Sequence, residues 1–390
     1  MSKLCVNLPP YSPDYSGCAS ALFELGGMIV LHDASGCTGN YLGYDEPRWM
    51  GSKSFVFCSG LRHMDAILGN DNLLIDRIVK AAESLKPKFI ALLGSPVPMV
   101  IGTDFEGVAA EIEYETKIPS IGLSTRGLAY YGKGVNQAII SLMEKVCPKA
   151  ENAANKNDGI NILGVTPLDF SKNSNAKDFV ELFEKNGIKV NCCFTMGCTF
   201  EEFKNSVYSK LNLVVSQSGY DTALYMKEKY NIPFIVGTPM AMGKLILEKI
   251  NPQKFKCTCK PFDNASEKKV LIAGEQVIGN SLREYLEVMG LKKGLVTVAT
   301  MFDVTKDLMR EYDLAVKDEK ALRTIINSGK YEKIIADPLV EELIKKENKA
   351  SIQFFPMPHV AVSSKVYWNE PVKFLSGEFV QFIKEIIRAN

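Results

Sequence analysis

Short apolar segments alternate with amphipathic segments along nearly the whole chain, and this alternation constrains the fold more than any other feature. We interpret GGMIVLH, FIALLGS and LNLVVS as buried strands, and DNLLIDRIVKAAESL, NAKDFVELFEKNG and PLVEELIKKE as helices. Strands that alternate with helices of about 10–15 residues are typical of parallel sheets covered on both faces. The pattern therefore predicts an α/β protein built from doubly wound parallel sheets.

Two polar stretches interrupt the alternation and divide the chain into three parts. CPKAENAANKNDG is charged and rich in Asn, and NPQKFKCTCKPFDNASE is another polar segment, so both suit linkers. At 390 residues the chain is also too long for one ordinary domain. We predict three Rossmann-like domains, residues 1–155, 156–262 and 263–390, the last of which ends in the amphipathic helix EFVQFIKEIIRA.

The composition argues against several classes of function. The net charge of +1 gives no electrostatic basis for binding nucleic acid or an anionic membrane surface. No window approaches the run of about 18 apolar residues that crosses a bilayer, and the N-terminal segment lacks the apolar core of a signal peptide. We expect a cytoplasmic protein whose 10 cysteines stay reduced. The sequence contains 3 histidines, which gives little support to a His-rich metal site or a serine hydrolase.

Cys18 and Cys37 are the cysteines placed best for chemistry. Each follows a glycine, Cys18 at the expected first turn of a helix and Cys37 in the turn after GGMIVLH. A helix N-terminus lowers the pKa of a thiol, and glycine lets a bulky group approach the backbone. Both positions suit thiolate ligands of a soft metal, with two small core residues as the alternative interpretation. Cys58, at another strand-to-loop change, would by itself more often be a core residue.

Three other segments receive structural interpretations. NCCFTMGC and KCTCK carry five cysteines, but they lack paired CxxC spacing and a histidine partner, so we expect packing and surface thiols there and no zinc site. GEQVIGNS has the spacing of a P-loop but carries Asn280 where a lysine contacts the phosphates. We expect an ordinary strand, turn and helix at this position and no bound nucleotide.

The order of several motifs resembles the nitrogenase component 1 family. The motifs are GCASALFELGG, LHDASGC, MDAILGNDNLLIDRI, LGSPVPMVIGTDFEGVA, LNLVVSQSGYDTALYMKEKYNIPFIVGTPM and KVLIAGEQVIGNSLREYLEVMG, and they cover nearly the whole chain. The family includes both subunits of the molybdenum–iron protein and their cofactor-assembly relatives. It also includes the catalytic subunits of dark-operative protochlorophyllide reductase and of the nickel-tetrapyrrole cyclase of methanogens. The resemblance implies three Rossmann-like domains around a central cleft.

The resemblance also implies an iron–sulfur cluster shared at a subunit interface. The first two cluster cysteines of the family match Cys18 and Cys37, but the third falls where this chain has Ser95. The family motif His-Gly-Pro-x-Gly-Cys corresponds here to His-Asp-Ala-Ser-Gly-Cys, from His32 to Cys37, so only its two ends match. Four thiolates hold a 4Fe–4S cube. A homodimer would supply them as Cys18 and Cys37 from each chain. Alternatively, Cys58 is the third ligand, and a partner chain or an oxygen ligand completes the set.

A substrate pocket between the domains is a further expectation from the resemblance. In the family, the large cofactor, where present, is ligated by a cysteine at the position that corresponds to Ser216. Because this chain has serine there, we expect neither an iron–molybdenum-type cofactor nor dinitrogen reduction. The methionines of TPMAMG are suited to contact a flat, polarisable ligand such as a tetrapyrrole. The alternative is that they belong to the hydrophobic core. The residues expected to bind the substrate are Ser216, Gln217, Thr238, Met240 and His359.

We favour a reductase catalytic component as the function. Such a component receives electrons from an ATP-dependent iron–sulfur reductase of the nitrogenase iron-protein type, through the interface cluster, and passes them to the substrate. One alternative is a scaffold for the assembly of a metal cluster or metallocofactor. Another is a three-domain binding protein without redox function. The cluster implies an oligomer, either a homodimer or a heterodimer or tetramer with a homologous chain.

Overall fold

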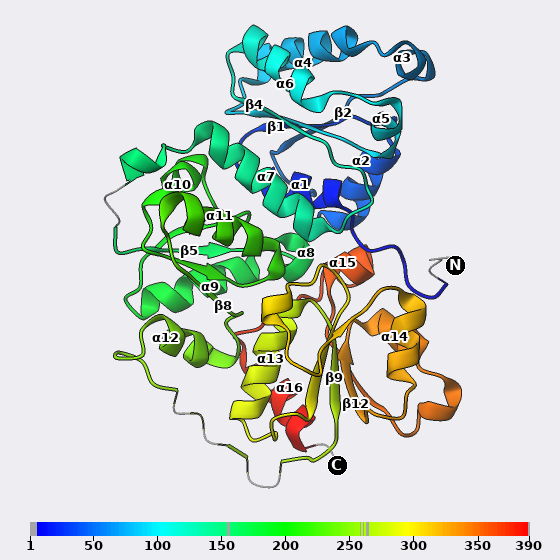
Figure 1. The fold of residues 1–390 in the computed structure, drawn as a ribbon, viewed down its shortest axis with the longest axis vertical. Coiled ribbons are helices and arrows are strands. Elements are labelled where there is room, and N and C mark those ends of the chain that lie inside the picture. The colour runs from blue at the N-terminus through cyan, green and yellow to red at the C-terminus, as the bar shows by residue number, and fades with distance from the viewer. Residues whose placement is uncertain (1–5, 154–156, 258, 260, 263–264, 389–390) are drawn as a thin grey trace.

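Three parallel sheets follow one another along the chain in the computed structural model (Figure 1). The structure describes residues 6–153, 157–257, 259, 261–262 and 265–388. Within these residues, no helix combines the length and the apolar character needed to cross a bilayer. The predicted α/β class with parallel sheets is confirmed. Parts of both predicted linkers, at 154–156 and at 258, 260 and 263–264, lie outside the described residues.

All strand pairs within these sheets are parallel, and the strand orders are related. The orders are β2-β1-β3-β4, β6-β5-β7-β8 and β11-β10-β9-β12-β13. In each unit the chain starts in an inner strand, adds strands on one side, and then crosses to the other side. This reversal creates a switch point, where the loops after two adjacent strands diverge and leave a crevice at the carboxyl ends.

The first sheet comprises β1 (Met28–Leu31), β2 (Phe55–Cys58), β3 (Ile90–Leu93) and β4 (Ser120–Leu123). The second comprises β5 (Ile160–Leu163), β6 (Val190–Cys193), β7 (Leu211–Val214) and β8 (Phe234–Val236). The third comprises β9 (Val270–Gly274), β10 (Val296–Thr300), β11 (Leu314–Ala315), β12 (Lys333–Ala336) and β13 (Gln353–Pro356). We call each sheet with its helices the first, second or third unit.

The helices of the first unit are α1 (Asp14–Leu22), α2 (Gly36–Asn40), α3 (His63–Leu68), α4 (Asp71–Leu85), α5 (Pro96–Ile101), α6 (Phe105–Thr116) and α7 (Tyr131–Val146). Those of the second are α8 (Pro167–Phe170), α9 (Ser174–Lys185), α10 (Phe200–Asn205), α11 (Tyr220–Tyr230) and α12 (Lys244–Ile250). Those of the third are α13 (Gln276–Val288), α14 (Glu319–Ile326), α15 (Val360–Ser363) and α16 (Gly377–Arg388). The segment PLVEELIKKE was wrongly predicted as a helix, because Pro338–Leu343 form only 3-10 turns.

Helices cover both faces of the first sheet because its strands are apolar on both sides. In β1, Met28 and Val30 pack in the core under α4 and α6, whereas Ile29 and Leu31 pack in the core shared with α1 and α7. Figure 1 shows α4 and α6 above this sheet and α1 and α7 below it, between the first and second units. The core around α1 and α7 continues into β7 and α11, so it joins the first two units.

Candidate functional site at the carboxyl ends of the strands

Three loops at the switch point of the first sheet bring Cys37, Cys58 and Ser95 to one edge. Cys37 is the second residue of α2, which follows β1. Cys58 ends β2 and pairs in register with Leu31 at the end of β1. Ser95 precedes α5, which follows β3, and its hydroxyl donates a hydrogen bond of 2.8 Å to the carbonyl of His32. Both thiols are partly exposed, whereas Ser95 is fully buried.

Asp33 holds the loop between β1 and α2. Its carboxylate accepts hydrogen bonds of 3.0 Å from the backbone N–H groups of Ser35 and Thr38. Its carbonyl oxygen lies 3.2 Å from the sulfur of Cys58 and accepts a hydrogen bond from the N–H of Leu61. Asp33 stands where the family motif has glycine, and it ties the loop that carries Cys37 to the loop that carries Cys58.

The environment of Cys37 combines burial, negative charge and two hydroxyl groups. Burial and the Asp33 carboxylate raise the pKa of the Cys37 thiol, and the nearby Cys58 acts in the same direction. Hydrogen bonds with Tyr15 and Ser95 lower this pKa but do not outweigh the other effects. Metal binding displaces the proton of such a thiol, so a raised pKa is compatible with a thiolate ligand. Cys37 and Cys58 therefore form one partly exposed pair.

Cys18 has a different environment from the one that the sequence suggested. Because α1 begins at Asp14, Cys18 lies in the second turn and not at the helix N-terminus. Its side chain is 0% exposed, and its sulfur lies 3.0 Å from the carbonyl oxygen of Gly134 in α7. Burial and the charge of Asp14 raise the pKa of this thiol well above its usual value. The expected lowering of the pKa is wrong.

The glycine before each cysteine serves a different purpose. A Cβ on Gly17 would lie 2.0 Å from the carbonyl oxygen of Tyr131, and a Cβ on Gly134 would lie 1.9 Å from that of Asp14. Gly17 therefore allows α1 and α7 to cross closely. A Cβ on Gly36 would meet nothing within 4 Å. Only Gly36 leaves open space beside its cysteine.

The described residues supply only part of a metal site. Within them, no three His, Cys, Asp or Glu side chains come together around a point where a metal ion would fit. Cys37 and Cys58 nevertheless fit the chemistry of a thiolate-bound cluster, because both are partly exposed at one edge. A cluster with four thiolates would need two further ligands besides this pair.

Exposed apolar side chains lie on the elements that adjoin the two thiols. Met64 and Leu68 in α3 are 58% and 69% exposed, and Val100 in α5 is 78% exposed. Helices α3 and α5 contact each other. We call the following residues the apolar rim: Phe57, Met64, Ile67, Leu68, Val97, Val100 and Ile101. Exposed apolar patches of this kind mark interaction surfaces.

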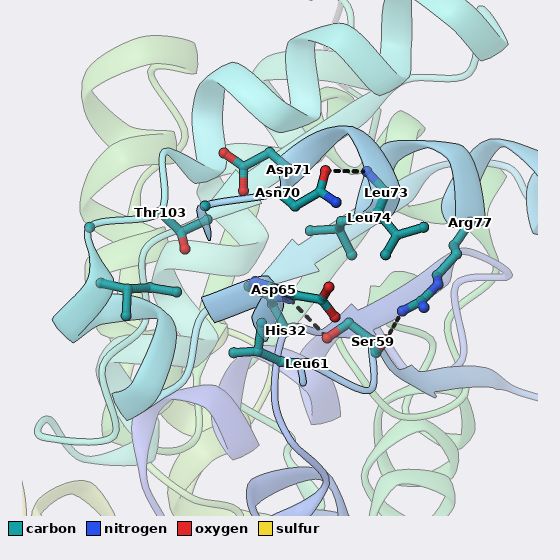
Figure 2. Close-up of a pocket in the computed structure, with 13 residues that line it drawn as sticks. His32, Ser59, Leu61, Asp65, Asn70, Asp71, Leu73, Leu74, Arg77 and Thr103 are labelled. Atoms are coloured by element: carbon teal, nitrogen blue, oxygen red, sulfur yellow. Dashed lines mark hydrogen bonds between the residues drawn. The ribbon is translucent and has the colours of Figure 1, made fainter. Parts of the chain in front are cut away.

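A small polar pocket lies behind the loops of the two thiols, between α3, α4 and α5 (Figure 2). Its volume is about 140 Å³. Nδ1 of His32 lies 2.8 Å from the hydroxyl of Ser59, and Arg77 donates a hydrogen bond to the carbonyl of Ser59. Burial lowers the pKa of His32, although Asp71 opposes this effect. His32 is therefore a neutral side chain that supports the loop after β2.

A buried polar cluster lies at the switch point of the second sheet, where the second unit meets the first and third units. Asp169, which follows β5, accepts hydrogen bonds from the hydroxyls of Tyr131 at 2.5 Å, Ser216 at 2.9 Å and Ser218 at 2.8 Å. Nε2 of His359 lies 3.3 Å from the same carboxylate. We call these five residues the junction cluster. Burial alone would raise the pKa of Asp169. The interaction with His359, followed by the hydrogen bonds from Tyr131 and Ser218, instead keeps this pKa below its usual value.

The structure does not bring the five predicted substrate residues together in one pocket. Ser216 and His359 belong to the junction cluster, and Gln217 forms hydrogen bonds with residues of the third unit. Thr238 and Met240 instead border a gap of about 10 Å³, which is too small for a tetrapyrrole. Residues that follow different strands of the second sheet thus pack against different partners, and substrate binding by these five residues stays a prediction.

A much larger cavity lies between the first and third units and has a volume of about 660 Å³. Residues 9–13, Tyr15, Asp45 and Pro96 line one side, and Ala361 and residues 363–366 line the other. Sequence reasoning missed this cavity because its walls come from distant parts of the chain. The only local signal was the cluster of Pro and Tyr residues in LPPYSPDY.

Two of the three segments that were given structural interpretations, GEQVIGNS and NCCFTMGC, have such roles in the fold, whereas KCTCK includes residues 258 and 260, which lie outside the described residues. GEQVIGNS forms the end of β9 and the start of α13, and the carboxylate of Glu275 accepts N–H groups of Val277 and Ile278 where a P-loop would bind phosphate. In NCCFTMGC, Cys192 and Cys198 are buried with their sulfurs 2.7 Å apart.

Comparisons with known proteins agree on one family. The model described as nitrogenase component 1 type oxidoreductase matches residues 13–245. The nitrogenase molybdenum-iron protein alpha chain of Clostridium pasteurianum is 30% identical over 188 residues, 46% of this chain and 34% of that protein. The nitrogenase iron-molybdenum cofactor biosynthesis protein NifE of Methanococcus maripaludis is 24% identical over 57% of this chain and 46% of its own length.

A third relative and a solved structure extend the comparison. One of the subunits of the light-independent protochlorophyllide reductase of Nostoc punctiforme is 25% identical over 45% of this chain and 36% of that protein. The chain thus spans about a third to a half of the length of these curated relatives. The structure Nitrogenase Cp1 at pH 6.5 has a TM-score of 0.72 at 15% identity and covers 99% of this chain and 93% of that chain. This likeness shows a shared fold.

Proposed function

Because the chain belongs to the nitrogenase component 1 type oxidoreductase family, we propose that it is a reductase subunit that holds an iron–sulfur cluster through Cys37 and Cys58. The observation that carries the proposal is the partly exposed thiol pair at the switch point of the first sheet, bordered by the apolar rim. Two thiolates of a second subunit, either another copy or a homologous chain, would complete the ligand set of a 4Fe–4S cluster.

The residues around the thiol pair have separable roles in this proposal. Asp33 fixes the spacing of the two loops through its hydrogen bonds to backbone N–H groups. Tyr15 and Ser95 hydrogen-bond with Cys37 and would tune its basicity as a ligand. The apolar rim would exclude water when the second subunit docks. A bound cluster would supply single-electron transfer, at a potential set by charge, hydrogen bonds to sulfur and solvent exposure.

The electrons would come from a separate ATP-dependent iron–sulfur reductase of the nitrogenase iron-protein type. A reductase role is supported by the similarity to one subunit of a light-independent protochlorophyllide reductase. This chain also offers no lysine in GEQVIGNS, and the helix start there already binds the carboxylate of Glu275. Nucleotide hydrolysis is therefore assigned to the partner.

An assembly scaffold is the second candidate, and one specific observation favours it. Serine occupies both positions where the family has further cysteines, Ser95 at the cluster and Ser216 at the large cofactor. A site with fewer thiolates binds a metal cluster or metallocofactor less tightly. Such a site is suited to transfer the cluster or cofactor to another protein. The similarity to a cofactor biosynthesis protein points in the same direction.

The decisive experiment is anaerobic purification followed by iron and sulfide quantitation and EPR of the reduced protein. We expect about four iron atoms per two chains. Cys37→Ala and Cys58→Ala should each lose most of the iron, whereas Cys18→Ala, the matched control, should keep it. Iron retained in both of the first two variants, or lost only in the third, would refute the ligand assignment.

A further measurement separates the two candidate functions. The iron-loaded protein is incubated with a reduced partner reductase and ATP, and separately with a cluster-free acceptor protein. Repeated reoxidation of the partner supports the reductase. A single transfer of iron to the acceptor, without reoxidation of the partner, supports the scaffold.

A further inference from the structure

Two cysteines of the second unit lie in direct contact, although they are 6 positions apart in the sequence. Cys192 lies in β6, and Cys198 lies in the turn between β6 and α10. Their sulfurs are 2.7 Å apart. Both side chains pack in the core that joins the first and second units, whereas Cys193 packs in a different core. Because side chains alternate along a strand, only Cys192 is placed beside Cys198. We call Cys192 and Cys198 the buried dithiol.

The turn between β6 and α10 has a conformation that returns Cys198 to the strand. Thr195 has a φ of 72°, which β-branched residues rarely adopt, and Gly197 has a φ of 77°. The hydroxyl of Thr195 donates a hydrogen bond to the carbonyl of Val165. Strained backbone of this kind persists only where surrounding contacts maintain it. The contact between the two sulfurs is therefore built into the turn.

Two residues of the first unit hold the same turn. Arg48 donates a hydrogen bond of 2.9 Å to the carbonyl of Thr195. The carboxylate of Glu24 accepts a hydrogen bond of 2.7 Å from the N–H of Gly197. Arg48 and Glu24 also form an ion pair of 3.2 Å. We call these four residues the clamp, because they join the turn that carries Cys198 to the first unit.

The spacing of the two sulfurs favours a bond between them over a shared metal ion. Two thiolates that bind one tetrahedral metal ion at about 2.3 Å lie about 3.8 Å from each other. Among the residues that the structure describes, no three His, Cys, Asp or Glu side chains surround a point where a metal ion would fit. Two thiols in direct contact, without a third ligand, are suited to form a disulfide.

The two thiols differ in their access to solvent. Cys198 is 4% exposed, but its neighbours Gly197 and Thr199 are both exposed. Cys192 is 2% exposed, and burial raises the pKa of its thiol well above the usual value. A small oxidant therefore reaches Cys198 first, and Cys192 is placed to react with the oxidised sulfur.

We propose that the buried dithiol is a site of reversible oxidation, at which a peroxide converts the two thiols into a disulfide that locks the clamp. The sulfur of Cys198 attacks one oxygen of hydrogen peroxide, the O–O bond breaks, and a sulfenic acid and one water form. The thiol of Cys192 then displaces a second water from the sulfenic sulfur, and the S–S bond forms. The two thiols thus supply the two electrons that reduce one peroxide to two waters. The site is separate from the pair Cys37 and Cys58, so the inference goes beyond the proposed function.

Thiol labelling followed by mass spectrometry tests the site in the full chain without iron. The protein is treated with hydrogen peroxide, unfolded, labelled with N-ethylmaleimide and digested with trypsin, which releases residues 190–204 with three cysteines. The untreated peptide should carry three labels, and the treated peptide should carry one, on Cys193. Dithiothreitol should restore all three labels. Unchanged labelling, sulfinic acid without a disulfide, or a single label on a cysteine other than Cys193 would overturn the proposal.

Two variants separate the buried dithiol from the other thiols. Cys198→Ala should keep both of its labels after treatment, whereas Cys193→Ala, the matched control, should lose both. Treatment should raise the unfolding temperature of the wild type and of Cys193→Ala by about 2–5 °C more than that of Cys198→Ala, because a disulfide restrains the unfolded chain. An equal change in all three proteins would overturn the lock. If Cys198→Ala fails to fold, the position of the label in the wild-type peptide decides. Neither readout involves iron, so the proposed function is tested separately.

Discussion

The carboxyl edge of the first sheet and the junction of the second and third units each contain a switch point, where ligands bind in folds of this kind. The two regions differ in how much space their side chains leave for a ligand. At the first sheet, the loops carry two partly exposed thiols and open onto a cavity of about 660 Å³. At the junction, Asp169 gathers hydroxyl groups and His359 around one buried carboxylate. The rule predicts where a ligand site can form, whereas side-chain packing decides whether space remains for a ligand.

The difference suggests a division of labour between the two regions. The junction cluster joins Tyr131 of the first unit, Asp169 of the second and His359 of the third through one carboxylate. A buried polar network of this kind rigidifies its surroundings. The open edge of the first sheet can then hold loops with exposed thiols, because the relative position of the units is fixed elsewhere.

The largest expected effect in this comparison comes from Asp169→Asn. The amide cannot accept the same set of hydrogen bonds, and buried partners are left unsatisfied, so we expect a loss of about 3–5 kcal/mol in the free energy of unfolding. Asp65→Asn, in the half-exposed polar pocket, is the matched control and should change stability by less than about 0.5 kcal/mol. Urea unfolding followed by circular dichroism measures both. Equal losses would remove the distinction between a closed and an open region.

The next effect concerns the two glycines that precede Cys18 and Cys37. Gly17→Ala places a methyl group 2.0 Å from the carbonyl oxygen of Tyr131, so α1 and α7 must separate, at a cost of about 1–3 kcal/mol. Gly36→Ala meets nothing within 4 Å and should change the stability by less than about 1 kcal/mol. Thermal unfolding of both variants checks this pair. Similar unfolding temperatures for the two would mean that α1 and α7 are not closely packed.

Much of the fold followed from the sequence, because apolar strands and amphipathic helices differ in period. DNLLIDRIVKAAESL was predicted as a helix, and α4 has the same bounds, Asp71–Leu85. PLVEELIKKE has a helical pattern, but the segment tightens into 3-10 turns between β12 and β13. Helical periodicity alone does not separate an α-helix from short 3-10 turns.

The candidate site was harder to predict than the fold. Gly17 before Cys18 and Gly36 before Cys37 look alike in the sequence, but one faces another helix and the other faces open space. The sequence does not record which element lies beside a glycine. The same limit hid Asp169, whose importance comes from partners far apart in the chain. The substitution of Asp33 into the family motif was a signal that could have identified the residue that holds the thiol loop.

The smallest expected effect is a pH dependence that originates at the junction. Burial, with the charge of Asp169, raises the pKa of Glu275 to about 7 in the folded protein, against about 4.3 for a free glutamate. Between these values the folded state binds more protons than the unfolded state, so stability should fall as the pH rises from about 4.5 to 7. Glu275→Gln removes this titration and should flatten the profile between these two pH values. Asp45 at the cavity has a pKa raised to about 6 and acts in the same direction, so Asp45→Asn should flatten the profile less and over a lower range. Urea midpoints measured from pH 4.5 to 8 distinguish the two variants. A pH profile of stability that neither substitution flattens would contradict both assignments, and a larger change in Asp45→Asn would place the dominant buried charge at the open edge and not at the closed junction.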